Sequence, residues 1–260
     1  MKKINYLFPT ILIDSLRLIK NFIPFISYTH VLKRNKQYKN IKKGKTVFII
    51  ANGPSLNNFD IPSLYGKEVI VMNNFNFAEW KEKVNIVAHC IGEPKDSNQW
   101  GVDQIEIIKE TEAQAYWFHI SVLKDVEEKN KSINKNCNYV FPIIPPGLWN
   151  NKSKINLAMP VLGYQTTAQM ALMVAIYMGY KKINLIGFDH DWLCHRDEAP
   201  HFYEKKDSIK KDILSTISYY KLIKISEMMW KIYYKIKYSA INSGSEITNL
   251  SSPSYLDVFD

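Results

Sequence analysis

The stretch TVFIIANGPSL, residues 46–56, decides the fold of this chain. Its first part, TVFIIA (46–51), is apolar and rich in β-branched residues, which is the pattern of a strand buried on both faces. The Asn-Gly-Pro-Ser that follows, residues 52–55, has the composition of a turn. Five more runs have the same strand pattern: EVIVM (68–72), NIVAH (85–89), AYWFHI (115–120), NYVF (138–141) and INLIGF (183–188).

Helical patterns lie between several of these strands, at residues 105–111, 122–130 and 167–178. A long amphipathic stretch over 205–239 is followed by a last predicted strand, SEITNL (245–250). Strands that alternate with helices imply parallel pairing through right-handed crossovers. The sequence therefore predicts one α/β domain over residues 46–260, with a Rossmann-like, doubly wound, mostly parallel sheet and flanking helices.

The composition is that of a globular protein. Of 260 residues, 46% are hydrophobic and 23% are charged, which excludes a disordered chain, a collagen and a small disulfide scaffold. The basic residues behind the formal charge of +9 are 31 Lys and only 3 Arg. The arginine guanidinium groups that read guanine edges in DNA by two hydrogen bonds are therefore nearly missing, and specific nucleic-acid binding is not expected. Cys90, Cys137 and Cys194 fit no disulfide or zinc pattern, and we expect reduced, cytoplasmic thiols.

The positive charge belongs to the first 45 residues. They hold 11 basic residues and one acidic residue, a balance of +10, whereas residues 46–260 hold 23 basic and 24 acidic, a balance of −1. Leu12, Leu16, Ile19 and Ile23 recur at helical spacing, and the basic run KRNKQYKNIKKGK (33–45) follows them. This pattern predicts an amphipathic and basic arm, residues 1–45, that binds an anionic membrane surface. The alternative is a helix packed on the body of the protein.

A row of aromatic residues lies in the predicted late helix: Tyr219, Tyr220, Trp230, Tyr233 and Tyr234. Such a row is either a face for lipid or a partner, or core flanked by lysines. The second interpretation is the commoner one.

Polar residues follow the first two predicted strands. In a parallel sheet these positions lie at the carboxyl edge, where ligands bind. Gly53 permits close backbone approach, and Ser55 is expected to cap a following helix so that its amides face a phosphate. Asn73 offers an amide that can read a base or a ribose. The glycines of a dinucleotide fingerprint and the GK[ST] of a P-loop are absent, and local turn preference is the alternative explanation.

Two further segments bring chemistry to the same edge. Thr166 and Thr167 open the helix 167–178, whose N-terminus is suited to an anion, although capping alone also explains them. After strand 183–188 come Asp189 and Asp191. Their spacing matches no zinc pattern, and the alternative to a metal site is that Asp189 braces the binding loop by hydrogen bonds.

The general base that we select is His201, which lies in a polar loop before a helix, where an imidazole can take a proton from a hydroxyl. His190 and His195 are competitors, and Arg196 is suited to a diphosphate or a carboxylate. Three other histidines are expected to be structural: His30, His89 and His119.

The order of these motifs resembles a known family. A strand followed by NGPSL, a strand followed by MNNF, Thr-Thr at a helix start, then VAIYMGYKKINLIGFD and a loop with histidine is similar to the bacterial sialyltransferases exemplified by the Campylobacter lipooligosaccharide enzymes. It also looks like the wider MptE-like group of surface-polysaccharide proteins. The resemblance covers most of residues 46–250.

The resemblance implies a CMP-sugar donor held without a metal. The donor-binding positions that match are Asn52, Gly53, Pro54, Ser55, Asn73, Thr166, Thr167 and Asp189, and the matching base is His201. In that family tyrosine hydroxyls contact the leaving phosphate, and Tyr203 lies near one such position. The chain departs from the pattern at Tyr164, where the family has Arg, and at Asp191, where it has Tyr.

The predicted function is therefore an inverting glycosyltransferase that moves a sugar, sialic-acid-like from a CMP-sugar, to a glycolipid or surface-glycan acceptor in lipopolysaccharide or capsule biosynthesis. Its expected place is peripheral, at the cytoplasmic face of the cell membrane. No cofactor is expected, with Mg²⁺ left open because Asp191 would suit a cation beside a diphosphate. The alternatives are a Mg²⁺-dependent pyrophosphokinase, a UDP-sugar enzyme and a non-catalytic nucleotide-sugar-binding scaffold, and a homo-oligomer is left open.

Overall fold

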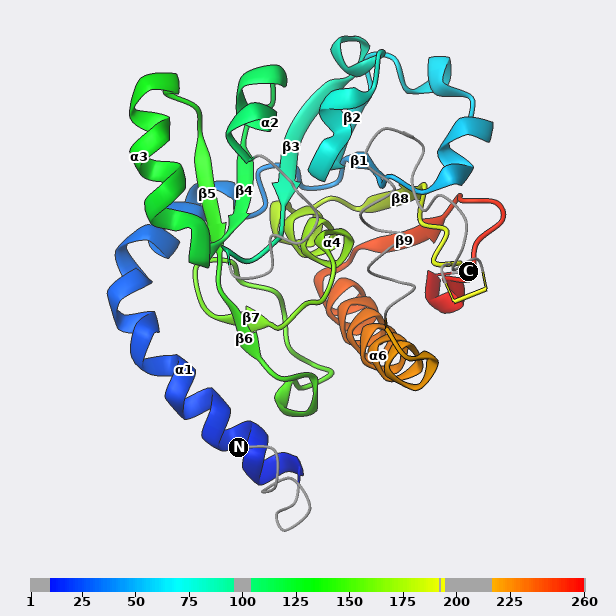
Figure 1. Cartoon of the computed structure of the whole chain (residues 1–260). Helices are drawn as coiled ribbons and strands as arrows, with labels where there is room; N and C mark the ends of the chain where they lie inside the picture. Colours follow the sequence, from blue (N-terminus) through cyan, green and yellow to red (C-terminus); the bar gives the residue numbers. More distant parts are fainter. Residues whose placement is uncertain (1–9, 96–103, 192, 195–216, 260) are drawn as a thin grey trace.

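The computed structural model of the chain describes residues 10–95, 104–191, 193–194 and 217–259 (Figure 1). Among these residues, seven strands form one sheet in which every neighbouring pair is parallel. They are β1 (Thr46–Ile50), β2 (Glu68–Met72), β3 (Asn85–Ile91), β4 (Tyr116–His119), β5 (Cys137–Val140), β8 (Lys182–Ile186) and β9 (Glu246–Asn249).

The strand order is β5-β4-β3-β2-β1-β8-β9. From β1 the chain builds the sheet outward in one direction as far as β5, and it then returns to the other side of β1 with β8 and β9. The predicted doubly wound, parallel α/β fold is therefore confirmed, and its topological switch point lies between β1 and β8.

The described helices are α1 (Thr10–Lys33), α2 (Gln104–Glu110), α3 (Leu123–Ile133), α4 (Thr167–Met178) and α6 (Tyr219–Ser243). They cover both faces of the sheet, with α2 and α3 on one side and α4 and α6 on the other (Figure 1). None of them combines the length and the apolar character that crossing a bilayer requires.

Side-chain alternation along β1 explains why its apolar run is continuous. Val47 and Ile49 join the core beneath α4 and α6, whereas Phe48 and Ile50 pack on the opposite face with Val69 and other residues of β2. Successive residues of a strand point to opposite faces, so a strand covered on both sides needs apolar residues at every position.

Helix α4 is buried along its whole length, between the sheet and α6. Its sequence, TAQMALMVAIYM, is apolar on almost every side, as expected of a helix without a solvent face. Gly179 ends it in a left-handed conformation with φ of 87°. The backbone amides of Asn40 and Lys42 donate to the carbonyls of Tyr177 and Met178 at 3.0 and 2.8 Å, which satisfies the last turn of the helix.

The end of the basic arm is packed on the body of the protein. Leu32 and Asn35 are fully buried, and the Asn35 amide donates to the carbonyl oxygens of Tyr139 and Leu157 at 2.8 and 2.7 Å. Lys42 pairs with Glu68 at 2.7 Å. The N-terminal half of α1 extends away from the sheet (Figure 1). A domain boundary at residue 45 stays a prediction.

The structure differs from the predicted elements in detail. Two short parallel strands, β6 (Pro142–Ile144) and β7 (Val161–Leu162), form a second small sheet that the sequence did not indicate, because neither is long enough to show a period. The late helix begins at Tyr219 and ends at Ser243, beyond the predicted Ser239. Its predicted start at residue 205 lies outside the described residues. The three cysteines are free thiols.

Candidate functional site

The candidate site lies at the switch point, where the segments after β1 and β8 meet. Asn52 to Ser55 follow β1, and Gly187 to Asp191 follow β8. In open α/β sheets the crevice at the carboxyl ends of the strands beside the switch point is the usual place for a ligand.

Gly53 and Gly187 permit a very close approach of these two segments. The backbone N–H of Gly53 donates to the carbonyl oxygen of Gly187 at 3.0 Å. A Cβ atom on Gly53 would overlap that oxygen and would lie 2.5 Å from Asp189 Oδ2. Gly187 itself has φ of 74°, in the left-handed region that glycine adopts without cost. The contact therefore requires glycine at both positions.

Asp189 braces the turn after β1. Its buried carboxylate accepts hydrogen bonds from the Ser55 backbone N–H at 2.8 Å and from the Ser55 hydroxyl. Burial raises the pKa of the Asp189 carboxyl, and the two hydrogen bonds from Ser55 oppose that shift. The bracing hydrogen bonds considered for Asp189 on sequence grounds are thus present.

The expected role of Ser55 as a helix cap is wrong. Residues Pro54–Asn58 form a 3₁₀ turn without a side-chain cap, and Gly53 stands in the cap position. The amide of Ser55 is bound by Asp189, so it does not face a phosphate. The side-chain and backbone donors of Ser55 instead fix the shape of the turn.

Two asparagines leave buried acceptors open at the ends of β1 and β2. The Asn52 amide donates to the carbonyl oxygen of Met72 at a long 3.5 Å, and its Oδ1 is buried without a partner. Oδ1 of Asn73 is also buried without a hydrogen-bond partner, and Asn73 has a left-handed φ of 46°. A buried acceptor without a partner is costly, so the two amide oxygens are suited to N–H or O–H donors of a ligand.

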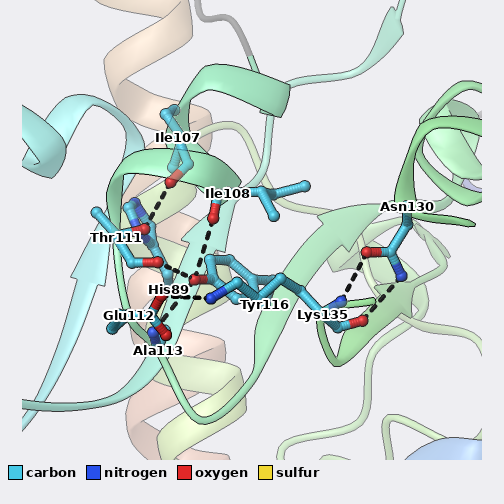
Figure 2. Close-up of polar contacts among 9 residues, drawn as sticks. All are labelled: His89, Ile107, Ile108, Thr111, Glu112, Ala113, Tyr116, Asn130 and Lys135. Carbon is cyan, nitrogen blue, oxygen red and sulfur yellow. Dashed lines mark hydrogen bonds and ion pairs between the residues drawn. The ribbon is translucent and has the colours of Figure 1, made fainter. Parts of the chain in front are cut away.

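The buried His89 holds Asn73 in place, and Figure 2 shows the surroundings of His89. Nε2 of His89 lies 2.8 Å from the carbonyl oxygen of Asn73, and Nδ1 lies 3.1 Å from the Thr111 hydroxyl. Burial lowers the pKa of His89 to about 4, so the ring is neutral at pH 7. Because a carbonyl only accepts, Nε2 carries the proton and donates to Asn73.

The network around His89 extends to α2 and β4. The Thr111 hydroxyl lies 2.6 Å from the carbonyl oxygen of Ile107 and 3.1 Å from Nδ1 of His89, so its single proton serves one of these two acceptors at a time. The Tyr116 hydroxyl donates to the carbonyl oxygen of Thr111 (Figure 2). Lys135 pairs with Glu112 beside them at 2.5 Å. The turn that carries Asn73 is therefore tied to the end of α2 through one neutral imidazole.

The N-terminus of α4 reaches the same edge of the sheet. The Thr166 hydroxyl accepts the backbone N–H of Gln169 at 3.3 Å, which is the predicted capping contact. The Thr167 hydroxyl accepts the N–H of Gly92, directly after β3, at 3.2 Å. Tyr164 donates its hydroxyl to the carbonyl oxygen of Gly92 at 3.1 Å. Both backbone polar groups of Gly92 thus anchor the start of the helix.

His190 and Tyr233 connect the loop after β8 to this helix start. His190 Nε2 lies 2.8 Å from the Tyr233 hydroxyl, and that hydroxyl is also hydrogen-bonded to Thr166. Burial lowers the pKa of His190 to about 4. The ring packs on Phe188 and against Trp230. His190 is therefore a neutral link within the protein.

The sequence did not single out Tyr233 for the site. It lies in the aromatic row of α6, but it is fully buried, whereas Tyr219, Tyr220 and Tyr234 are 54%, 67% and 46% exposed. The row is thus divided between two faces of the helix. Gly92 was also missed, because the predicted strand ended at His89 whereas β3 runs to Ile91 and delivers Gly92 to this edge. The expected structural role of His89 agrees with its hydrogen bond to Asn73.

Several predicted site residues cannot be placed. His195, Arg196, His201 and Tyr203 lie outside the described residues, and their roles remain predictions. Asp191 is half-buried, and its carbonyl oxygen accepts the N–H of Cys194 at 2.8 Å. Within the described part of the chain, no three His, Cys, Asp or Glu side chains are grouped as a metal site.

Comparisons with known proteins give matches among solved structures. No model of a known protein family and no curated protein matches the chain. The chain is similar to the sialyltransferase CstII from Campylobacter jejuni in complex with cytidine-5'-monophosphate, at 16% identity and a TM-score of 0.48, over 84% of each chain. A second structure of CstII, with CMP-3FNeuAc, gives 18% identity and a TM-score of 0.44, over 83% of this chain and 84% of that one.

Proposed function

We propose that this chain is an inverting glycosyltransferase that takes a sugar from a nucleotide donor, a CMP-sugar by the resemblance of its motifs, to a glycolipid or surface-glycan hydroxyl. The observation that carries the proposal is the pair of buried, unpartnered amide oxygens of Asn52 and Asn73 at the switch point of the sheet. They follow the neighbouring strands β1 and β2, beside a turn that packs too tightly for any residue but glycine.

The chemistry of a nucleoside fits these acceptors. The exocyclic amino group of cytosine and the ribose hydroxyls donate hydrogen bonds, and amide oxygens accept them. In the proposed complex Asn52 and Asn73 take these donors, while Gly53 and Pro54 offer backbone and ring surface to the nucleoside. Ser55 and Asp189 contribute by holding the turn in shape.

The phosphate of the donor is assigned to the start of α4. This 12-residue helix is long enough to place partial positive charge at its N-terminus. The Thr167 hydroxyl accepts from Gly92, which leaves its own proton available for a phosphate oxygen. Thr166 lies beside it as the cap. Donors fixed before the reaction stabilise the charge that develops on the departing nucleotide.

His201 is the proposed general base. It removes the proton of the acceptor hydroxyl, whose oxygen attacks the anomeric carbon as the bond from that carbon to the phosphate oxygen breaks. The nucleotide leaves with the bonding electrons, and the sugar is inverted. Three described histidines are weaker candidates, because His89, His119 and His190 each have a pKa lowered to about 4 by burial and each is hydrogen-bonded within the protein. They are weak bases at neutral pH. His195 is left as the competitor in the same predicted loop, and the match to the family motif selects His201.

A thermal-shift screen tests the donor assignment. CMP, UDP, GDP and ATP are each added with and without Mg²⁺, and a ligand at 100 times its Kd stabilises the fold by about 2.7 kcal/mol. We expect stabilisation by CMP without metal. Stabilisation by UDP or ATP only with Mg²⁺ would replace the CMP-sugar donor by a UDP-sugar or a pyrophosphoryl donor. Indifference to all four nucleotides would contradict the proposal.

A transfer assay tests the base. His201→Ala is expected to bind CMP like the wild type and to lose transfer at least about 100-fold, whereas the control His30→Ala keeps it. Full activity of His201→Ala would overturn the assignment of the base. CMP binding by the wild type without transfer to any of a set of glycolipid acceptors would favour a non-catalytic binding protein.

A further inference from the structure

Helix α1 carries an exposed apolar face. Leu16, Ile19 and Ile26 are 60%, 65% and 70% exposed. Their spacing of three and seven residues places them on one side of the helix. Phe25, Leu32 and Val31 are buried against the body of the protein instead. The apolar face therefore lies on the part of α1 that the body does not cover, where Figure 1 shows the helix extending away from the sheet.

Uncompensated positive charge follows this face along the chain. Lys33, Lys36, Lys39 and Lys43 are exposed. Within the part of the chain that the structure describes, none of these four makes an ion pair, in contrast to Lys42, which pairs with Glu68 at 2.7 Å. The balance of the first 45 residues is +10.

We propose that this arm surface, defined as Leu16, Ile19, Ile26, Lys33, Lys36, Lys39 and Lys43, binds an anionic lipid bilayer. Apolar side chains enter the boundary between headgroups and acyl chains, and lysines bind the negative headgroups, so one partner satisfies both features. A second copy of the chain fits less well, because a two-fold contact would bring two sets of the same unpaired lysines together. This inference does not depend on the nucleotide site.

Co-sedimentation of the full chain with vesicles tests the proposal. The vesicles are phosphatidylcholine alone or phosphatidylcholine mixed with phosphatidylglycerol. One variant replaces the apolar face (Leu16→Asp, Ile19→Asp, Ile26→Asp). Its control replaces three exposed residues with large apolar side chains elsewhere on the protein (Tyr65→Asp, Met159→Asp, Leu250→Asp). A second variant changes Lys33, Lys36, Lys39 and Lys43 to Gln, and its control changes the exposed Lys109, Lys124, Lys129 and Lys131 to Gln.

The wild type is expected to bind the mixed vesicles and not the neutral ones. The partition coefficient falls about fivefold per lysine removed, and thus by at least about 100-fold in the lysine variant. Each Asp on the apolar face lowers it by roughly tenfold or more. Both controls bind like the wild type. Circular dichroism and the thermal midpoint establish that the variants are folded.

Two results would overturn the proposal. One is undiminished binding of either arm variant to the mixed vesicles. The other is that neither protein binds vesicles, while light scattering shows a dimer for the wild type and a monomer for the apolar-face variant. The apolar face would then be an interface between two copies of the chain.

Discussion

Replacing Gly53 by Ala tests the close packing of the two segments at the switch point. The φ of Gly53 is −67°, so an alanine backbone is not strained there, and the whole effect comes from the added methyl group. That carbon would lie 2.5 Å from Oδ2 and 2.7 Å from Cγ of the buried Asp189. The Gly187 carbonyl oxygen lies closer still, so relief of the overlap requires the carboxylate to move away from Ser55 and the Gly187 backbone to shift. Overpacking costs about 1–3 kcal/mol and a lost hydrogen bond to a charged group about 1.5–3 kcal/mol, so we expect the free energy of unfolding to fall by about 3 kcal/mol.

For a chain of this length the loss corresponds to a fall of roughly 6–12 °C in the thermal midpoint. Differential scanning calorimetry measures it, and Gly163→Ala is the matched control, because a Cβ there meets its nearest neighbour, the Ile144 carbonyl oxygen, at an ordinary 3.5 Å. The control is expected to melt within about 2 °C of the wild type. A Gly53→Ala protein that melts together with the control would refute the packing argument.

The remaining predictions concern the brace and the buried histidines. Asp189→Asn keeps one acceptor oxygen but turns an NH₂ group toward the donors of Ser55, so urea unfolding should show a loss of about 2 kcal/mol; an unchanged midpoint would contradict the bracing role. His89 and His190 both have a folded-state pKa of about 4, below the ordinary value of about 6.5, so the unfolded chain binds protons first as the pH falls. Their contribution to stability is complete above pH 6.5 and is lost between pH 6.5 and 4, by about 3 kcal/mol for each. Urea titrations at pH 7, 5.5 and 4.5 should show this fall in the free energy of unfolding, and the fall should be smaller in His89→Gln. A free energy of unfolding that does not change with pH would contradict the prediction.

The architecture could be predicted because burial on both faces leaves a clear trace in the sequence. The strands TVFII and EVIVM are apolar at four of five positions and KINLI at three of five, and the structure places each of them between two other strands of the sheet. Helix α4 was predicted with its observed bounds, and the structure shows Thr166 capping its start and Gly179 ending it. In such elements local preference and tertiary burial agree.

The details of the site depend on contacts between distant segments, which local preference does not encode. Ser55 looks like a helix cap in the sequence, but 134 residues further on Asp189 takes both of its donors. Tyr233 belongs to an aromatic row, yet it lies on the buried face of α6, where it is linked to His190 and Thr166. Partners of this kind become visible only when the strand order is known.

The central claim is that a nucleotide binds at the switch point through Asn52. Calorimetric titration of CMP, without metal, into the wild type and into Asn52→Ala tests it most directly, with Asn57→Ala as the control, because Asn57 is exposed in the same turn. The wild type and the control should bind CMP equally, and Asn52→Ala should bind it at least about tenfold more weakly, since the ligand loses a buried hydrogen bond. Equal binding of CMP by all three proteins, or no binding by the wild type, would contradict the claim.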